Sequence, residues 1–196
     1  MKVAIIKYNA GNIRSVSFAL ERIGIIPVIT DDAEEIRSAD KVIFPGVGEA
    51  SSAMQYLKSK KLDEVIISLT QPFLGICLGM QLMCKHSEEG NTDCLGIFNE
   101  QVKLFPSKDL KVPQMGWNNI YNLKTALFNN VPENVYMYFV HSYYVELGND
   151  TINTTDYGLE YSSGLNKNNF YAVQYHPEKS SDAGQLILEN FVALNS

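Results

Sequence analysis

Residues 72–81 read Pro72-Phe73-Leu74-Gly75-Ile76-Cys77-Leu78-Gly79-Met80-Gln81. The first five residues form a short apolar run typical of a buried strand, and the residues from Met80 to about His86 are typical of a helix. Gly75 and Gly79 flank the junction and let neighbouring backbone pass without a clash against a Cβ atom. The stretch therefore predicts a strand, a tight turn that carries Cys77 and a helix, which together form one unit of an α/β sheet.

The residues before this stretch repeat the same alternation. Strands are predicted at 3–6, 25–30 and 41–44, and helices at 15–23, 32–37 and 50–69, the last in two pieces. Gly24 occupies the C-terminal cap position of the first helix, and Pro27 indicates that the second strand lies at an edge of the sheet. This order of elements favours helices packed around a mainly parallel sheet.

The pattern changes after residue 91. Strands are predicted at 101–105, 135–140 and 170–175, a turn region at 116–119 and a closing helix at 185–194, which is typical of a smaller antiparallel layer. No linker rich in Pro, Gly or Ser separates the halves, and no repeat recurs at a fixed period. We therefore expect residues 1–196 to form a single domain.

Composition argues against several classes of protein. The 196 residues carry 16 Lys and Arg against 22 Asp and Glu, a net charge of -6, so we expect no nucleic-acid partner. The longest apolar stretch, 73–83, is too short for a membrane span and is interrupted by Gln81, so we expect no membrane partner. Residues 1–7 lack a cleavage site and read as a first strand. Three cysteines without paired spacing fit a reduced compartment, and we expect a cytoplasmic location.

Cys77 has the setting of a nucleophile. A helix N-terminus favours a thiolate, and the backbone N–H of Leu78 can face an oxyanion formed by attack on a carbonyl group. The alternative is a buried structural cysteine in a glycine-rich turn.

A histidine and a carboxylate follow the predicted strand at 170–175, in the triplet His176-Pro177-Glu178. A thiol nucleophile needs a base that takes its proton, and that base needs a carboxylate that fixes its orientation. His176 and Glu178 can supply both functions. Without a partner cysteine, the same triplet would read as a solvent-exposed pair.

The loop Pro45-Gly46-Val47-Gly48 follows the third strand. Its two glycines let a backbone N–H turn into a cleft, as a second oxyanion donor must. An ordinary glycine turn and a phosphate-binding loop are alternatives, although the Gly-Lys-Ser/Thr ending of such loops is missing. Because this loop and Cys77 both follow parallel strands, they converge at one edge of the sheet.

Taken together, these motifs identify a family by resemblance. Gly-Ile-Cys-Leu-Gly-Met-Gln around Cys77, the Pro-Gly-Val-Gly loop and His-Pro-Glu resemble the three signatures of class I (triad) glutamine amidotransferases, in the expected order along the chain. The segments 113–118, 138–143 and 176–180, together with Gly11-Asn12-Ile13, are similar to the glutaminase subunits of imidazole glycerol phosphate synthases. The resemblance extends over nearly the whole chain.

The resemblance implies a flavodoxin-like α/β domain with a mainly parallel central sheet, helices on both faces and a smaller antiparallel layer. It implies that Cys77 attacks the side-chain amide of glutamine, that His176 transfers the proton and that Glu178 orients His176. The thioester is then hydrolysed to glutamate, and ammonia is released. By the same resemblance the oxyanion site comprises Gly46, Val47, Gly48 and Leu78, and glutamine is held by Gln81, His141, Ser142 and Tyr143.

The resemblance also implies a partner, a (β/α)8-barrel cyclase subunit in a heterodimer. That subunit uses the ammonia to make imidazole glycerol phosphate and aminoimidazole carboxamide ribotide in histidine biosynthesis, and its ligand activates the otherwise nearly silent glutaminase. No cofactor is implied. Positions that match the subunit interface are Asn12, Met115, Trp117, Tyr138 and Lys179.

Other functions remain open at this point. A paralogous amidotransferase subunit of a nucleotide-sugar or surface-glycan pathway would keep the same triad. A stand-alone cysteine hydrolase would need no partner, and a non-catalytic interaction module would not need the intact triad. Cys84, His86 and Cys94 lack a fourth ligand and paired spacing, so we expect them to be structural and expect no metal site.

Overall fold

The computed structural model describes residues 1–9, 12–106, 108 and 110–195. Gly11, which belongs to one of the segments that carry the resemblance, lies outside the described residues. In chain order the elements are β1 (Val3–Ile6), α1 (Ile13–Arg22), β2 (Val28–Thr30), α2 (Ala33–Arg37), β3 (Lys41–Phe44), α3 (Ala50–Ser59), α4 (Leu62–Ile67), β4 (Phe73–Ile76), α5 (Leu78–Met83), β5 (His86–Ser87), β6 (Thr92–Asp93), β7 (Gln101–Leu104), β8 (Gln114–Ile120), the 3₁₀ helix η1 (Ala126–Phe128), β9 (Val135–His141), β10 (Tyr143–Val145), β11 (Thr151–Asp156), β12 (Glu160–Lys167), β13 (Phe170–Val173), the 3₁₀ helix η2 (Pro177–Lys179) and α6 (Ser181–Ala193).

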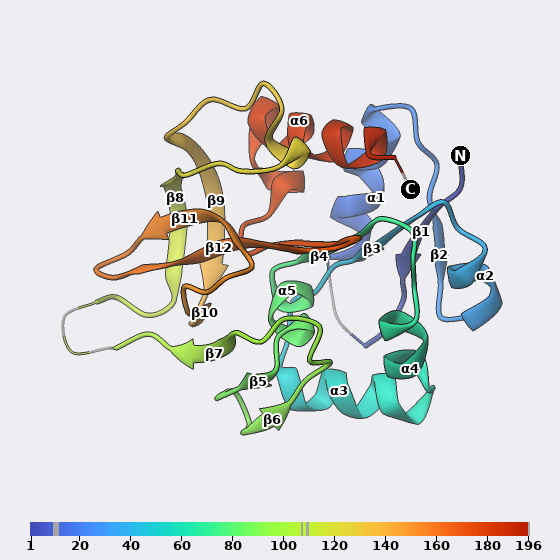
Figure 1. The fold of residues 1–196 in the computed structure, drawn as a ribbon, viewed down its shortest axis with the longest axis horizontal. Helices are drawn as coiled ribbons and strands as arrows, with labels where there is room; N and C mark the ends of the chain where they lie inside the picture. Colours follow the sequence, from blue (N-terminus) through green and yellow to red (C-terminus); the bar gives the residue numbers. More distant parts are fainter. Residues whose placement is uncertain (10–11, 107, 109, 196) are drawn as a thin grey trace.

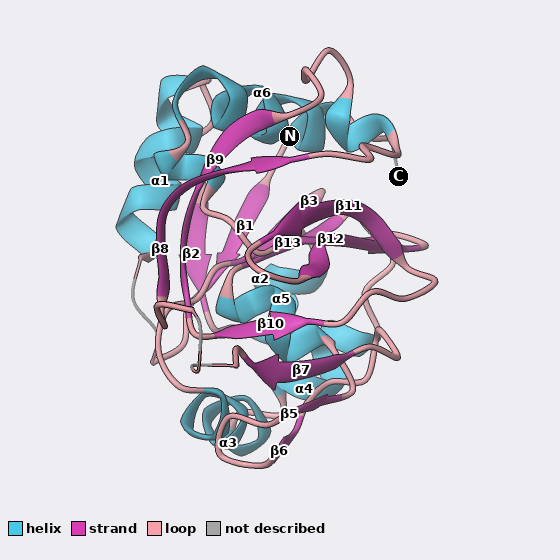
Figure 2. Ribbon diagram, turned by 90° about the vertical axis from the view of Figure 1, so that its left-hand side faces the viewer, coloured by secondary structure: helices cyan, strands magenta, loops and turns pink. Residues whose placement is uncertain are grey.

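One mixed sheet runs through the molecule (Figure 1). Its first part has the order β2-β1-β3-β4-β13 with parallel neighbours, so the carboxyl ends of these strands meet at one edge. Beyond β13 the sheet continues through antiparallel neighbours β12, β10 and β7, and β11 pairs with β12. Strands β8 and β9 form a separate antiparallel ribbon, which Figure 2 shows curving beside α1 and α6. The predicted fold class is confirmed, as is the edge position of β2.

Helices cover both faces of the parallel strands. In Figure 1, α3, α4 and α5 lie on one side of the sheet and α1 and α6 lie on the other. Along β1, Ala4 and Ile6 join the first apolar cluster, whereas Val3 and Ile5 join the second. Strands buried on both faces read as continuous apolar runs, which is why the sequence pattern identified them.

Two predicted elements near the site differ from the structure. The helix predicted at 80–86 begins at Leu78 and ends at Met83. It ends there because the N–H of Lys85 donates to the carbonyl oxygen of Glu100, which turns the chain into β5 beside β7. The turn predicted at 116–119 is wrong, since these residues lie inside β8 and pair with β9. Cross-strand pairing there overrides the local turn preference of glycine and asparagine.

The antiparallel strands β10, β11 and β12 were not predicted. Strands β11 and β12 bury serine, threonine and asparagine side chains, and these satisfy one another: Asn153 Nδ2 and Thr155 Oγ1 both donate to Ser163 Oγ, at 2.7 and 2.8 Å. A buried face built from polar residues gives no hydrophobic alternation. The hydrogen-bond partners that make such a face stable are visible only in the folded chain.

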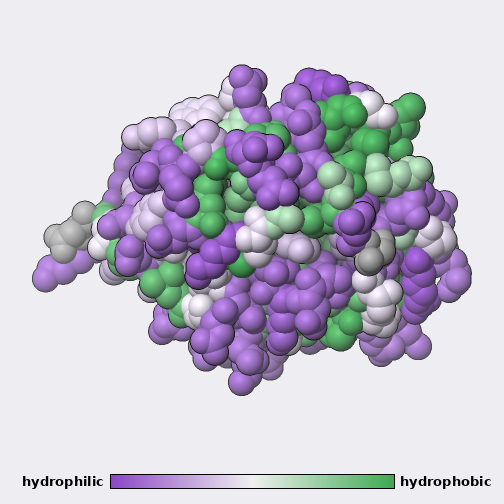
Figure 3. All heavy atoms as spheres, turned by 45° about the horizontal axis from the view of Figure 1, so that its top comes forward, coloured by the Kyte–Doolittle hydropathy of each residue, from purple (hydrophilic) through white to green (hydrophobic). Residues whose placement is uncertain are grey.

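The helices and the surface of the described residues bear on a possible membrane span. None of the helices in the described part of the chain has the length and apolar character needed to cross a bilayer. On the face shown in Figure 3, hydrophilic residues predominate and hydrophobic ones form separate patches.

Candidate active site

Cys77 occupies a strained turn between β4 and α5. Its backbone has φ 54° and ψ -111°, a conformation that is unfavourable for a residue with a side chain and is typical of functional sites. The turn fits only because glycines stand two residues before and two residues after Cys77. A Cβ atom on Gly79 would lie 1.9 Å from the carbonyl oxygen of Phe44, and one on Gly75 would lie 3.0 Å from the carbonyl carbon of Gly79. The close packing of β3, β4 and α5 therefore depends on both.

The strand predicted at 170–175 was assigned to the antiparallel layer, but β13 runs parallel to β4 in the main sheet, with Val173 paired to Ile76. This pairing places His176 and Glu178 beside the turn. His176 is fully buried, and its Nδ1 lies 2.8 Å from Glu178 Oε1. The side-chain amide of Asn12 also donates to Glu178 Oε1 and so helps to hold the carboxylate. The structure thus brings the histidine and the carboxylate together.

The surroundings of His176 change the pKa of its imidazole ring. Burial opposes the charged ring, but a negative charge on nearby Cys77 and the hydrogen bond with Glu178 outweigh it and raise the pKa of His176 to about 10. The Nε2 atom of His176 is buried and has no hydrogen-bond partner among the described residues. The ring can therefore exchange a proton with the sulfur atom of Cys77.

The predicted oxyanion loop lies against the turn that carries Cys77. The hydroxyl of Tyr8 donates to the carbonyl oxygen of Pro45 at 2.7 Å, and a Cβ atom on Gly46 would lie 2.1 Å from that hydroxyl. The N–H of Leu78 donates to the carbonyl oxygen of Gly46 at 3.2 Å. This donor is therefore occupied by a backbone acceptor.

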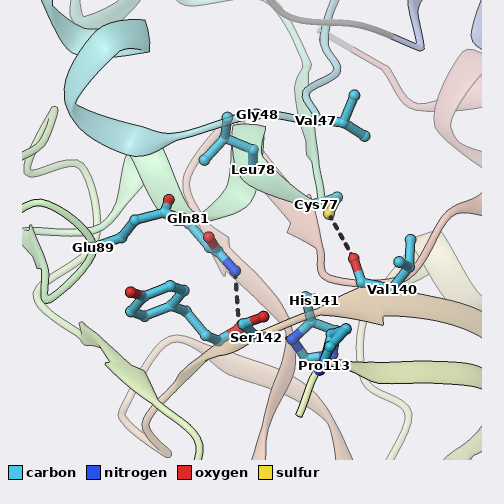
Figure 4. Close-up of a pocket in the computed structure, with 11 residues that line it drawn as sticks. Val47, Gly48, Cys77, Leu78, Gln81, Glu89, Pro113, Val140, His141 and Ser142 are labelled. Carbon is cyan, nitrogen blue, oxygen red and sulfur yellow. Dashed lines mark hydrogen bonds between the residues drawn. The ribbon is translucent and has the colours of Figure 1, made fainter.

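A cavity of about 250 Å³ opens beside Cys77 (Figure 4). It is lined by every residue predicted to bind glutamine and by all of the predicted oxyanion residues except Gly46, which is buried and does not line it. The lining residues are Val47, Gly48, Cys77, Leu78, Gln81, Glu89, Pro113, Val140, His141, Ser142 and Tyr143.

Hydrogen bonds hold Gln81, His141 and Tyr143 together along one wall of this cavity. The carbonyl oxygen of Tyr143 accepts from Gln81 Nε2 at 2.9 Å and from His141 Nδ1 at 2.7 Å. Burial lowers the pKa of His141 to about 4, so its ring is neutral at pH 7 and Nδ1 carries the proton that it donates. Because Gln81 Nε2 also donates to Gln174, the part of Gln81 left for a ligand is its oxygen atom.

Two residues of the site were missed by the sequence analysis. Glu89 lines the cavity at the end opposite Cys77 in Figure 4, and its Oε2 accepts from the N–H of Ala50 at 2.9 Å. Burial raises the pKa of this carboxyl group. Gln174 is fully buried beside Cys77. Nothing local marks Glu89, which sits in a polar loop, whereas the proximity of Gln174 to His176 in sequence was an available signal.

Most residues predicted for the partner interface share one exposed face. Trp117 and Tyr138 are paired across β8 and β9 with their rings edge to face, and Lys179 Nζ lies 5.9 Å from the Tyr138 ring centre. Met115 projects from the same face of β8 and is 63% exposed, and Trp117 is 53% exposed. Asn12 lies apart from this group, against Glu178.

The remaining cysteines are separate from the site. Cys84 is fully buried, and burial raises its pKa well above the ordinary value; burial also raises the pKa of Cys94 to about 12. His86 pairs with Asp93 at 3.0 Å. Across the ranges that the structure describes, no group of three or more His, Cys, Asp or Glu residues is placed to hold a metal ion.

The chain is similar in sequence to a known protein family and to named proteins of other organisms. The family model described as glutamine amidotransferase class-I matches residues 7–194. The imidazole glycerol phosphate synthase subunit HisH of Bacteroides fragilis strain YCH46 is 58% identical over 196 residues, spanning 99% of this chain and 100% of the relative. The protein of the same name from Pasteurella multocida strain Pm70 is 49% identical over 191 residues, spanning 97% and 96%.

Solved structures share the fold at low sequence identity. A protein from Thermoplasma acidophilum that is described as part of a GMP synthase aligns with a TM-score of 0.76 at 20% identity, over 98% of this chain and 92% of that one. PurLQS from Thermotoga maritima aligns with a TM-score of 0.72 at 15% identity, over 97% of both chains.

Proposed function

Because the chain belongs to the glutamine amidotransferase class-I family, we propose that it is the glutamine-hydrolysing subunit of an imidazole glycerol phosphate synthase, acting in histidine biosynthesis. The observation that carries this proposal is the arrangement of Cys77 beside the buried His176–Glu178 pair, at one end of a cavity. Full-length similarity to curated subunits of that synthase supports the specific pathway.

Acylation begins when Cys77 transfers its proton to His176. The sulfur then attacks the side-chain amide carbon of glutamine, an S–C bond forms and the carbonyl oxygen becomes an oxyanion. When this intermediate collapses, the C–N bond breaks and the nitrogen takes the proton from His176 and leaves as ammonia. The raised pKa of His176 favours the protonated ring that this step needs.

Hydrolysis of the thioester reuses the same residues. His176 removes a proton from water, the resulting hydroxide adds to the thioester carbon and the C–S bond breaks. Glutamate leaves, and Cys77 is restored. Glu178 orients His176 in both halves of the reaction through Nδ1.

The oxyanion formed in both steps needs donors. We infer that the N–H of Leu78 is one of these donors once it is released from Gly46. An N–H of the Gly46–Gly48 segment is the other. Because the N–H of Leu78 is occupied, we expect the isolated chain to have low activity. A partner that moves this loop would activate it.

The two ends of the cavity suit opposite ends of a glutamine molecule. With its side-chain amide at Cys77, glutamine extends toward Glu89, whose carboxylate complements the α-ammonium group. The polar residues Gln81 and Ser142 also line this cavity.

The partner that we propose is a (β/α)8-barrel cyclase subunit. The exposed face of β8 and β9, with Met115, Trp117, Tyr138 and Lys179, is the surface that it would cover. Asn12 lies apart from this face, against Glu178 of η2, and would be a second point of contact. Residues 1–196 would act as one amidotransferase domain in the cytoplasm, where the three free cysteines stay reduced.

The test is glutamate release from glutamine by the purified chain, alone and with its cognate barrel subunit and that subunit's ligand. We expect strong activation by the partner and its complete loss in Cys77→Ala. Formation of imidazole glycerol phosphate by the complex identifies the pathway. Brisk hydrolysis without the partner would contradict the subunit assignment, and activity that survives loss of Cys77 would contradict the triad.

A further inference from the structure

Gln174 contacts the sulfur atom of the nucleophile. It follows β13, and the register that pairs Ile76 with Val173 places it beside Cys77. Its side chain is fully buried, and its Nε2 lies 3.6 Å from Cys77 Sγ, within the range of a hydrogen bond to sulfur. The mechanism described above gives this residue no function.

A chain of hydrogen bonds fixes which end of the Gln174 amide faces the sulfur. The carbonyl oxygen of Tyr143 can only accept, so the nitrogen end of Gln81 must face it. That same nitrogen lies 3.0 Å from the side-chain oxygen of Gln174, which must therefore be the acceptor. The remaining end of Gln174, its NH₂ group, points at Cys77. The donor role toward sulfur thus follows from the network.

The N–H of Gln174 is placed to stabilise a negative charge on the sulfur of Cys77. Besides His176, the carbonyl oxygen of Val140 approaches Cys77 Sγ, at 3.9 Å, and it can accept from a thiol but repels a thiolate. The amide N–H of Gln174 is attracted more strongly to a thiolate than to a thiol, because hydrogen bonds to charged groups are stronger than those between neutral groups. Burial strengthens this preference, since little water competes.

We propose that Gln174 is a catalytic residue that donates a hydrogen bond to the Cys77 sulfur whenever the sulfur carries negative charge. This occurs twice: before attack on glutamine, and when the C–S bond of the thioester intermediate breaks and the electron pair returns to sulfur. Because Gln174 is neutral, it stabilises this charge without replacing His176 as the proton carrier. The proposal rests on the proposed function of Cys77 as the nucleophile.

The test compares Gln174→Met, which keeps the length of the side chain but has no donor, with the wild-type chain. The pH dependence of Cys77 alkylation by iodoacetamide is followed by mass spectrometry of the Cys77 peptide, in the chain without a partner. We expect the midpoint of the alkylation curve to move upward, so that the rate at neutral pH falls about tenfold, as expected for one hydrogen bond to a charged group. Gln174→Glu, which places a carboxylate at the sulfur, should lower the rate further.

A matched control is Asn153→Leu, which removes a fully buried amide of β11 that does not contact Cys77. It should leave the alkylation curve unchanged. In the complex, Gln174→Met should lower kcat with little change in KM. If Gln174→Met does not fold, Gln174→Asn takes its place, because it keeps the amide but withdraws it from the sulfur.

The outcomes separate this proposal from the proposed function. An alkylation curve that matches the wild type in folded Gln174→Met overturns the role of Gln174, even if kcat falls, because a purely structural residue would give that result. Glutaminase activity that survives Cys77→Ala overturns the nucleophile itself, whatever the Gln174 variants do.

Discussion

The backbone N–H of Leu78 donates to the carbonyl oxygen of Gly46, with 3.2 Å between the nitrogen and oxygen atoms. The same N–H is the donor that a helix N-terminus next to the nucleophile would offer to an oxyanion. Cys77, His176, Glu178 and the cavity are therefore in place while this donor is occupied. The proposed mechanism then requires a local rearrangement of the Pro45–Gly48 loop, and changes in this loop should affect turnover more than substrate binding.

Gly46→Ala should disturb this loop directly. The added methyl group would lie 2.1 Å from Tyr8 Oη and 3.0 Å from Leu78 Cβ, so we expect a loss of unfolding free energy of about 1–3 kcal/mol. Thermal and urea unfolding measure this change. Tyr8→Phe removes the hydroxyl, and the double variant should lose less stability than the sum of the two single variants. Additive effects would show that Tyr8 does not limit the space at Gly46.

The two buried histidines should titrate far apart. His176, with a pKa raised to about 10, should remain an imidazolium at pH 8, whereas His141, with a pKa lowered to about 4, should be neutral. Nitrogen NMR of the labelled chain distinguishes the two states. Cys77→Ala should lower the pKa of His176, because it removes the nearby negative charge that favours the imidazolium. An unchanged His176 titration in this variant would contradict the thiol–imidazole pairing.

The same shifts have opposite effects on stability. A raised histidine pKa stabilises the fold below the ordinary value of 6.5, and this contribution is lost as the pH rises toward about 10. A lowered pKa, as for His141, stabilises the fold above 6.5, and that contribution is lost as the pH falls toward about 4. In Cys77→Ala, urea unfolding should therefore show a smaller loss of stability between pH 7 and 10 than in the wild type.

Glu89→Gln should weaken substrate binding. The variant keeps the acceptor for the N–H of Ala50 but removes the charge that complements the α-ammonium group of glutamine. We expect KM for glutamine to rise about tenfold with a smaller change in kcat, in line with a hydrogen bond to a charged group. Glu88→Gln is the matched control, since the Glu88 carboxylate binds the N–H of Leu104 outside the cavity. Equal effects of both variants would argue against the substrate orientation proposed for Glu89.

Trp117→Ala should weaken binding of the barrel subunit without altering the nucleophile. An exposed tryptophan at the centre of an aromatic face is typical of residues whose truncation raises Kd by about tenfold or more. Isothermal titration with the barrel subunit measures Kd, and alkylation of Cys77 in the free chain should be unchanged. Ile67→Ala, a similarly exposed residue of α4 on the other face of the sheet, is the control.

The three cysteines should differ in reactivity. Burial raises the pKa of Cys84 and of Cys94, the latter to about 12, so both should remain thiols at pH 8 and react slowly. Cys77 lies at the cavity beside an imidazolium and should be alkylated first. Peptide mapping after brief exposure to iodoacetamide gives the order. Earlier labelling of Cys94 would contradict it.

The fold was predictable where a local feature of the chain decided it. Strands β1 and β3 have the predicted bounds because parallel strands covered on both faces must be apolar throughout. The glycines around Cys77 predicted the turn because no other residue fits between β3, β4 and α5. Strands β11 and β12 were missed because their buried serine, threonine and asparagine residues are stabilised by partners from another strand.

By its sequence alone the chain determined which residue types follow the predicted parallel strands, and hence that Cys77 and the Pro45–Gly48 loop meet at one sheet edge, whereas the arrival of His176 at that edge depends on the parallel pairing of β13 with β4 in the folded chain. That inference needs only strand direction, which local patterns encode. Only the tertiary structure decided that the N–H of Leu78 is occupied, that Glu89 lines the far end of the cavity and that the amide of Gln174 faces sulfur. These facts depend on distances between segments remote in sequence, and such distances are set by packing of the whole sheet rather than by any local pattern.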